Sequence, residues 1–393
     1  MSQYVKNTLV TNVRLRQRTR FMHALQRRIL VLATSILVLL GGSSAAERIW
    51  KTEDVGQGVV SAIAIDGSQN LHLVYVTNEA VLMYAFRPAS SPKWFTTPIL
   101  HSTHVIHNVF PRIVTDKNNQ PNVCVAIGTL EYIAFTNGAW TTQEIDPNSG
   151  TLSYHCSIAV AGNGTPHVIW YHEFFPGGKQ FAHARHADLE NGNWIVRSID
   201  GGISGKWNSL VVDAQGMPHV TYSQWASNGD IRYAAWDGKE WDIEALPRLK
   251  GEPAYRGYDN SLAFDRNGEP HISFLEEGSL QYAYRHEGKW VVEKAGDINT
   301  NYDFYLGGTA LVLDNNDIPH IIYGDVGAVK HAFKDGDKWK SEIIASGALG
   351  QYPGVDAVIG PDDTLYVSYA DPSDGRVKVA VGTVVSNSQE KAK

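Results

Sequence analysis

The sequence has 393 residues, of which 10% are aromatic and 36 are glycine, and its 34 basic and 41 acidic residues give a net charge of −7. Residues 1–46 hold seven of the basic residues and no acidic one, so the remaining chain has 27 basic and 41 acidic residues and a net charge of −14. Such an acidic chain argues against nucleic acid or an anionic membrane as a partner, and its length suits one large domain.

The first 46 residues are expected to form a separate N-terminal segment. Basic residues precede an apolar run at 29–40, and small residues then lead to Ala46. This order is typical of a secretory signal peptide cleaved near Ala46, which predicts a secreted or periplasmic protein. The alternative is a membrane anchor formed by residues 29–42, although crossing a bilayer takes about 20 apolar residues. Translation from Met22 would give a signal of more ordinary length.

A phrase close to Asp-x-x-Gly-x-Pro-His, followed by an aliphatic and an aromatic residue, recurs at intervals of about 50 residues. The clearest copies are 213–222, 265–274 and 314–323, and weaker copies start at positions 66, 116, 161 and 360. Alternating β-branched and aromatic residues bounded by turn residues predict four short strands in each unit. Four-stranded units repeated radially form the blades of a β-propeller.

The two ends of the chain each carry half of a repeat. Trp50 has no Asp phrase before it, and the copy at 360 has no Trp after it. The Trp50 region is therefore predicted to supply the outer strand of a last blade whose inner strands are residues 354–383. The predicted fold class is all-β: a seven-bladed propeller of four-stranded antiparallel blades over residues 47–384, closed by the N-terminal strand. Residues 385–393 are expected to be a disordered tail.

The repeated Asp and His residues are expected to be scaffold. Asp213, His219 and their equivalents would stand on separate blades, too far apart to converge on one metal ion, and no metal site is predicted. We expect the Asp to cap the amides of its turn, the Gly to supply a positive φ and the His to pack or bond across the blade. The repeated Trp is expected to fill the wedge between neighbouring blades.

Cys124 and Cys156 are the only two cysteines. The first lies in the second predicted blade and the second at the start of the third. Two buried free thiols are expected, with a disulfide as the alternative.

Function is expected where the repeat is broken, on the face that carries the blade-to-blade loops around the central channel. These loops gather aromatic rings with His, Arg, Asn and carboxylates, a mixture that suits the stacking and orientation of sugars. The residues predicted to bind a ligand are His107, Trp207, Trp225, Asp259, Asn260, Tyr302, Tyr305, Glu276 and Tyr352. Those predicted to be catalytic are Tyr258, Arg256, His155 and Glu173.

The blade pattern resembles the sialidase-type (BNR-like) repeat propellers of exported carbohydrate-active proteins. The resemblance covers residues 47 to about 384 and rests on the spacing of the blades. The sialidase Asp-box, Ser-x-Asp-x-Gly-x-x-Trp between third and fourth strands, is absent, because the Asp-Gly turn here lies between first and second strands. The resemblance therefore implies carbohydrate as the ligand and gives no sialidase active site.

Some propellers of this broad group are polysaccharide lyases that use Tyr, His and Arg, and Tyr258, Arg256, His155 and His107 have the side chains for that chemistry. In a lyase or glycosidase, Tyr258 or His155 would act as base or acid and Arg256 would bind a sugar acid. Candidate carboxylates are Glu173, Asp259 and Glu276.

The sequence thus predicts an exported propeller that binds carbohydrate and, if it is catalytic, processes it. The alternative is a non-catalytic protein-interaction scaffold whose partner is an extracytoplasmic protein. No cofactor is predicted, and a structural or catalytic divalent cation stays an open alternative. A monomer without a nucleic-acid partner is expected.

Overall fold

The computed structural model describes residues 47–101, 110–127, 129–147, 152–224, 229–249, 256–276, 278–298, 308–347 and 354–385. The chain divides into two units, Met1–Ser44 and Ala45–Lys393, and all described residues belong to the second. The predicted signal or anchor segment and residues 386–393 lie outside the described residues. Within the described part, no helix is long and apolar enough to cross a membrane.

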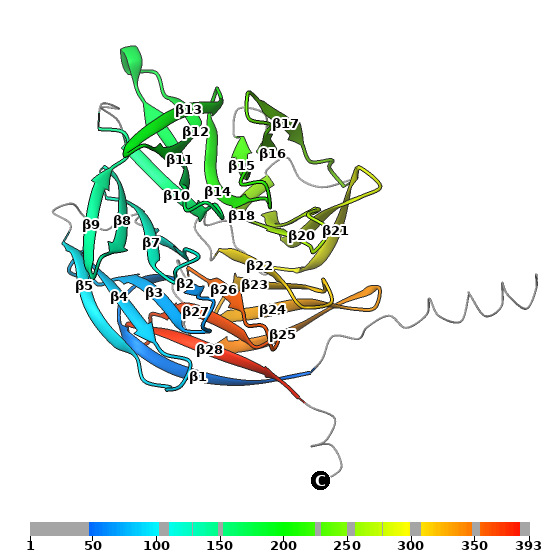
Figure 1. Ribbon diagram of the computed structural model, residues 1–393. Helices are drawn as coiled ribbons and strands as arrows, with labels where there is room; N and C mark the ends of the chain where they lie inside the picture. Colours follow the sequence, from blue (N-terminus) through cyan, green and yellow to red (C-terminus); the bar gives the residue numbers. More distant parts are fainter. Residues whose placement is uncertain are drawn as a thin grey trace, which may run out of the picture. The chain divides into compact units, whose positions relative to one another are not determined.

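Seven four-stranded antiparallel sheets follow one another around a common centre, with the first strand of each innermost (Figure 1). The first blade holds β2 (Val60–Ile65), β3 (Leu71–Val76), β4 (Val81–Arg87) and β5 (Phe95–His101). The second holds β6 (Arg112–Thr115), β7 (Pro121–Ala126), β8 (Leu130–Thr136) and β9 (Ala139–Glu144). The third holds β10 (Leu152–Val160), β11 (Pro166–Phe174), the short 3-10 helix η1 (Pro176–Gly178), β12 (Phe181–Glu190) and β13 (Asn193–Asp200).

The remaining blades keep the same order. The fourth holds β14 (Ser204–Val212), β15 (Pro218–Gln224), β16 (Asp230–Trp236) and β17 (Trp241–Ala245). The fifth holds β18 (Arg256–Phe264), β19 (Pro270–Glu276), β20 (Ser279–His286) and β21 (Lys289–Asp297), and the sixth holds β22 (Thr309–Leu313), β23 (Pro319–Asp325), β24 (Ala328–Asp335) and β25 (Lys338–Ser346). The seventh holds β26 (Asp356–Ile359), β27 (Leu365–Asp371), β28 (Arg376–Val384) and β1 (Arg48–Gln57).

The predicted seven-bladed propeller and its closure by the N-terminal strand are confirmed. β1 pairs antiparallel with β28, and Trp50 lies opposite Gly382 in that ladder. A Cβ on Gly382 would stand 2.6 Å from the Trp50 ring, so glycine is needed for the ring to pack there. The seventh blade therefore joins both ends of the domain and leaves β28 without an open edge.

The hydrophobic core is divided into seven clusters, one between each pair of neighbouring blades. The alternation of each strand sends its side chains to both faces of its sheet, and each face packs on a neighbour. The cluster between the seventh and first blades, for example, combines Val377 and Val379 of β28 with Ile63 and Leu73 of the first blade.

The Asp of the repeated phrase caps its turn in five blades. Its Oδ1 accepts hydrogen bonds of 2.8–2.9 Å from the amides two and four residues on, at Asp66, Asp116, Asp213, Asp265 and Asp314. In three of these blades, at His72, His219 and His271, the His that follows lies near the same carboxylate and contacts a third-strand tyrosine. The second blade has Asn122 in this place, and in the sixth blade His320 contacts His331 instead of a tyrosine. His219 Nε2 lies 3.3 Å from Asp213 Oδ2, and its Nδ1 lies 2.6 Å from the Tyr233 hydroxyl. The predicted scaffold role is confirmed for these described copies.

The repeated Trp lies between blades, as predicted. Its ring makes an edge-to-face contact with a third-strand Tyr or His of the preceding blade, with centroids 4.9–5.7 Å apart in six interfaces. In four interfaces its indole N–H also donates to a glutamate of the preceding blade, over 2.9–3.1 Å. The pairs are Trp94 with Glu53, Trp290 with Glu244, Trp339 with Glu293, and Trp50 with Glu342.

Cys124 of β7 and Cys156 of β10 form a disulfide, with their Cα atoms 6.3 Å apart. The expectation of two free thiols is wrong, because β7 and β10 belong to neighbouring blades that pack face to face, and both sulfurs reach the same interface. The disulfide therefore joins the second blade to the third.

Replacing both cysteines with alanine is expected to lower the free energy of unfolding by about 3–4 kcal/mol, because the bond closes a loop with a sequence separation of 32 residues. In a domain of this size that corresponds to a fall in melting temperature of roughly 5 °C, measured by differential scanning calorimetry. Reducing the wild-type protein should give the same fall and leave the double variant unchanged. Equal melting temperatures of wild type and double variant would refute a stabilising bond.

Candidate functional site

The innermost strands of the blades surround a cavity of about 360 Å³ on the central channel. One first-strand position per blade faces the following blade, and its occupants are Ala62, Arg112, Ser157, Ser209, Ser261, Ala310 and Asp356. Ser209, Ser261 and Asp356 accept hydrogen bonds of 3.0–3.1 Å from the backbone of the next blade. These contacts hold neighbouring first strands together around the channel.

Two of these seven positions carry a charge where the others carry alanine or serine. Arg112 and Asp356 both line the cavity. The Arg112 guanidinium acts on the pKa values of His155, Asp259 and Asp356, which belong to the third, fifth and seventh blades. Burial raises the pKa of Asp356, and Arg112 opposes that rise.

The first strands of the third, fourth and fifth blades are bulged at the mouth of the channel. The register of β10, β14 and β18 shifts at equivalent positions, and the bulge residues His155, Trp207 and Asp259 have φ angles of 47°, 44° and 38°. Left-handed backbone costs a non-glycine residue of the order of 1–3 kcal/mol and persists where the surroundings impose it. We call these three residues the bulge arc.

Side chains of the following blade hold the bulge arc in place. The amide of Asn208 donates to the His155 carbonyl, and the amide of Asn260 donates to the Trp207 carbonyl. Asp259 Oδ2 in turn accepts a 3.1 Å hydrogen bond from the backbone of Gly308. Bulges re-aim side chains and are frequent beside active sites, so three consecutive bulges at one channel mouth mark it as a candidate site.

His155 lies in an aromatic stack. Its ring is 5.2 Å from that of Phe110 at an angle of 13°, and 5.8 Å from that of Trp207. Burial, together with the charges of Lys206 and Arg112, lowers the pKa of His155 to about 3. His155 is therefore neutral at physiological pH and too weakly basic to be the favoured general base.

Asp259 is better suited to acid–base chemistry. Burial raises its pKa to about 6, and the Arg112 charge opposes this rise. A carboxyl group that titrates near pH 6 can exchange a proton at near-neutral pH, whereas an ordinary aspartate is almost fully ionised there.

The two predicted glutamates lie on second strands near this mouth. Glu173 of β11 is buried and accepts a 3.2 Å hydrogen bond from the Tyr171 hydroxyl. The Lys206 ammonium lies 5.2 Å from the Tyr171 ring and 5.8 Å from the Trp207 ring. Burial lowers the pKa of Lys206, and the charge of Glu173 opposes this fall. Glu276, also buried, ends β19 opposite Arg256.

The structure thus brings His155, Trp207, Asp259 and Asn260 together along the bulge arc, with Glu173 beside Lys206 and Glu276 on the blade of Asp259. Arg256 and Tyr258 belong to β18, and nothing is described of their side chains. Five of the predicted binding residues lie outside the described residues: His107, Trp225, Tyr302, Tyr305 and Tyr352.

Sequence reasoning missed Arg112 and Asp356. The signal was present, because aligning the seven first strands shows a charged residue where other blades have small ones. Among the described residues there is no cluster of three or more His, Cys, Asp or Glu side chains that could hold a metal ion.

No protein-family model and no curated protein matches the chain in sequence. Solved β-propellers are similar in structure. An ulvan lyase in complex with a GlcA- and Rha-containing saccharide has a TM-score of 0.61 at 11% identity, over 88% of this chain and 99% of the lyase. A lectin from Burkholderia pseudomallei has a TM-score of 0.55 at 12% identity, over 84% and 96% of the two chains.

A variant of Aleuria aurantia lectin in complex with a methyl fucoside has a TM-score of 0.50 at 12% identity, over 76% of this chain and 98% of the lectin. At such identities the likeness shows the propeller fold alone. The narrower resemblance to sialidase-type repeats stays a prediction.

Proposed function

We propose that this protein is an exported propeller that binds carbohydrate at the channel mouth lined by the bulge arc. The observation that carries the proposal is the run of three strained bulges on neighbouring blades, at His155, Trp207 and Asp259, beside the channel cavity that the next residues Asn208 and Asn260 line. Aromatic rings beside hydrogen-bonding and charged groups suit the apolar faces and hydroxyl groups of a sugar.

Two further findings support the proposal. The solved propellers to which the chain is similar include two lectins and a polysaccharide lyase, one lectin and the lyase in complex with saccharides. The disulfide between Cys124 and Cys156 fits an oxidising compartment, as export through the predicted signal segment requires.

If the protein is catalytic, Asp259 is the residue we assign as acid or base, with Arg256 and Tyr258 as partners for a sugar acid. Because ionised Asp259 would be the base, turnover should rise as the pH increases through about 6. Arg112 lines the channel cavity together with Asp356, and its guanidinium is a group there that would pair with the carboxylate of an acidic sugar.

The test is a panel of acidic and neutral polysaccharides, with affinity measured by calorimetry and turnover measured as unsaturated products and reducing ends. We expect Trp207→Ala to weaken binding about tenfold or more, which is about 1.4 kcal/mol. Asp259→Asn should keep the affinity and remove turnover. The matched control Asp242→Asn changes an exposed aspartate of β17 and should alter neither. Failure of every polysaccharide to bind would sink the proposal and favour the protein-interaction scaffold.

A further inference from the structure

The third blade departs from the repeat on the opposite face, where the Asp turns lie. Ala161 stands where five other blades have the capping Asp, and Asn163 Oδ1 accepts the Thr165 amide at 2.9 Å in that carboxylate's place. His167 consequently lacks the carboxylate that its equivalents contact. Its Nδ1 lies 3.1 Å from His186 Nε2, and among the described residues its Nε2 has no hydrogen-bond partner.

The interface between the third and fourth blades also has its charges rearranged. In four other blades the residue three positions after the repeated Trp is a glutamate, and it accepts a hydrogen bond from the indole N–H of the next blade's Trp. In the third blade, Arg197 occupies this position after Trp194. In three other blades a basic residue of the third strand forms an ion pair with this glutamate; these residues are Arg87, Arg285 and Lys334. In the fourth blade, Trp236 occupies the equivalent position. The Arg197 guanidinium lies 5.6 Å from the Trp236 ring centroid. A cation on an aromatic ring thus replaces the ion pair of the other interfaces.

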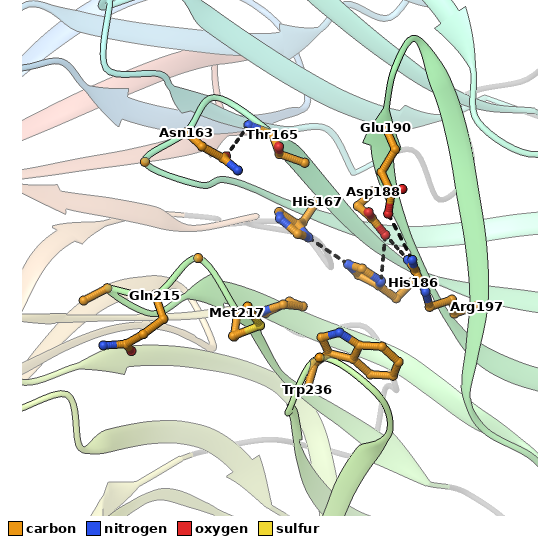
Figure 2. Close-up of a pocket in the computed structure, with 15 residues that line it drawn as sticks. Asn163, Thr165, His167, His186, Asp188, Glu190, Arg197, Gln215, Met217 and Trp236 are labelled. Atoms are coloured by element: carbon orange, nitrogen blue, oxygen red, sulfur yellow. Dashed lines mark hydrogen bonds and ion pairs between the residues drawn. The ribbon is translucent and has the colours of Figure 1, made fainter.

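These departures coincide with a pocket of about 540 Å³ between the two blades. Figure 2 shows Arg197 beside Asp188 and Glu190 on one wall, His167 and His186 at the back, and Trp236 and Gln215 on the opposite wall. Arg197 forms ion pairs with Asp188 and, at 3.2 Å, with Glu190. The volume is within the range of small-molecule sites.

A buried polar atom of a pocket-lining residue has no hydrogen-bond partner among the described residues. His186 is 2% exposed, and its Nδ1 is unpartnered, since the nearest Asp188 oxygen is 4.0 Å away. Behind it, the ring of Trp241 packs edge-to-face on His186, and its indole N–H, whose equivalents donate to the missing glutamate, is also unpartnered among the described residues. Unsatisfied buried polar groups cost about 1–3 kcal/mol each, a cost expected where a ligand supplies the partner.

We infer that this pocket is a second binding site and that its ligand is a neutral, hydroxyl-rich molecule, a pyranoside. Asp188 and Glu190 accept, Arg197 donates, and hydroxyl groups do both, so neighbouring hydroxyls can match a fixed row of acceptors and donors. The two carboxylates outweigh one guanidinium and disfavour an anion, while Arg197 disfavours a simple cation. Trp236 offers apolar surface for a sugar ring. The inference rests on this pocket alone and does not depend on the site at the channel mouth.

The test is saturation-transfer NMR and calorimetry on the whole protein, with the methyl glycosides of glucose, galactose, mannose and xylose as probes. We expect saturable binding of at least one of them. Ala161→Asp restores the repeat and should engage His167 Nε2, as Asp213 engages His219, so the fold should be kept. The ligand would then lose this nitrogen of a pocket-lining residue as a partner, and its affinity should fall tenfold or more. Trp236→Ala should weaken binding to a similar extent.

Ile343→Ser, on an exposed part of β25 far along the chain from both sites, is the matched control and should leave the affinity unchanged. No saturable binding of any of the four glycosides would overturn the inference, and so would binding that survives both Ala161→Asp and Trp236→Ala. Loss of polysaccharide binding at the channel mouth in Trp207→Ala, with glycoside binding kept, would show that the two sites are separate.

Discussion

Deleting residues 48–57, the closing strand β1, is expected to leave the protein unable to fold to a soluble form. The deletion removes every pair of the β1–β28 ladder, the Trp50 hydrogen bond to Glu342 and the packing of Val55. It also exposes the whole edge of β28, which is a template for aggregation. The free energy of unfolding of a domain is only about 5–15 kcal/mol. We expect the loss of one of the four strands of a blade to cost more than this.

Expression of the deletion variant and the wild type, followed by comparison of soluble fractions, measures this effect. Two point variants make it quantitative. Gly382→Val would place a side chain against the Trp50 ring and should lower the free energy of unfolding by about 1–3 kcal/mol. Ile49→Ser changes a residue of the same strand that is 57% exposed, and should stay within about 0.5 kcal/mol of the wild type. A soluble, cooperatively unfolding deletion variant would show that the ring closes without β1.

The fold could be predicted in detail from the sequence because the residues that determine the turns and strands of each blade lie close together within its repeat. Asp213 and its equivalents cap a turn through bonds that reach only four residues along the chain, and such contacts can be read from spacing. The closure by Trp50 could be predicted because a half-repeat at each end leaves one arrangement in which every blade has four strands.

The disulfide could not be predicted in the same way. Its formation depends on which face of β7 and of β10 carries each sulfur and on the packing of two blades, and a one-residue shift in either strand would have turned one cysteine away. The spacing of residues along the chain shows neither the face on which each cysteine lies nor how the two blades pack.

The candidate sites were predicted only in part, for two physical reasons. Assigning the repeated residues to the scaffold directed attention to the loop-rich face, where His155, Trp207 and Asp259 do lie together. The pocket between the third and fourth blades lies on the other face, where Ala161, Arg197 and Trp236 depart from the repeat. The sequence shows these departures, but the size of the pocket depends on how the neighbouring blade packs.

Acid is expected to destabilise the protein well before its carboxylates are protonated. Burial, as the main cause, lowers the pKa of His155 to about 3 and those of His167, His172 and His331 to about 4. In the unfolded chain a histidine has a pKa near 6.5. Below pH 6.5 these histidines bind protons in the unfolded state but stay neutral in the folded state. The free energy of unfolding therefore falls from about pH 6.5 until the histidines are also protonated in the folded protein, near pH 4.

Each of these histidines contributes a loss of the order of 1–2 kcal/mol between pH 7 and pH 5. Asp259 acts in the opposite direction, because its raised pKa favours the folded state as it becomes protonated near pH 6. Asp66, Asp265 and Asp314 have lowered pKa values and add a further loss only below about pH 4. The net expectation is a steep fall in unfolding free energy between pH 6.5 and 4, measured by urea denaturation.

His331→Tyr isolates one contribution, because the repeat itself supplies the replacement. The ring of His331 lies between His320 Nδ1 and the Trp50 ring, and it is contacted by Glu342 with Arg48 nearby. In the fifth blade Tyr282 occupies the equivalent position against His271 and Trp339. A tyrosine does not titrate below pH 7, so this variant should take up about one proton fewer on unfolding and lose less stability in acid. His286→Gln, at an exposed position of β20, should leave the pH dependence as in the wild type. An identical slope in His331→Tyr and wild type would mean that buried His331 does not drive the acid loss.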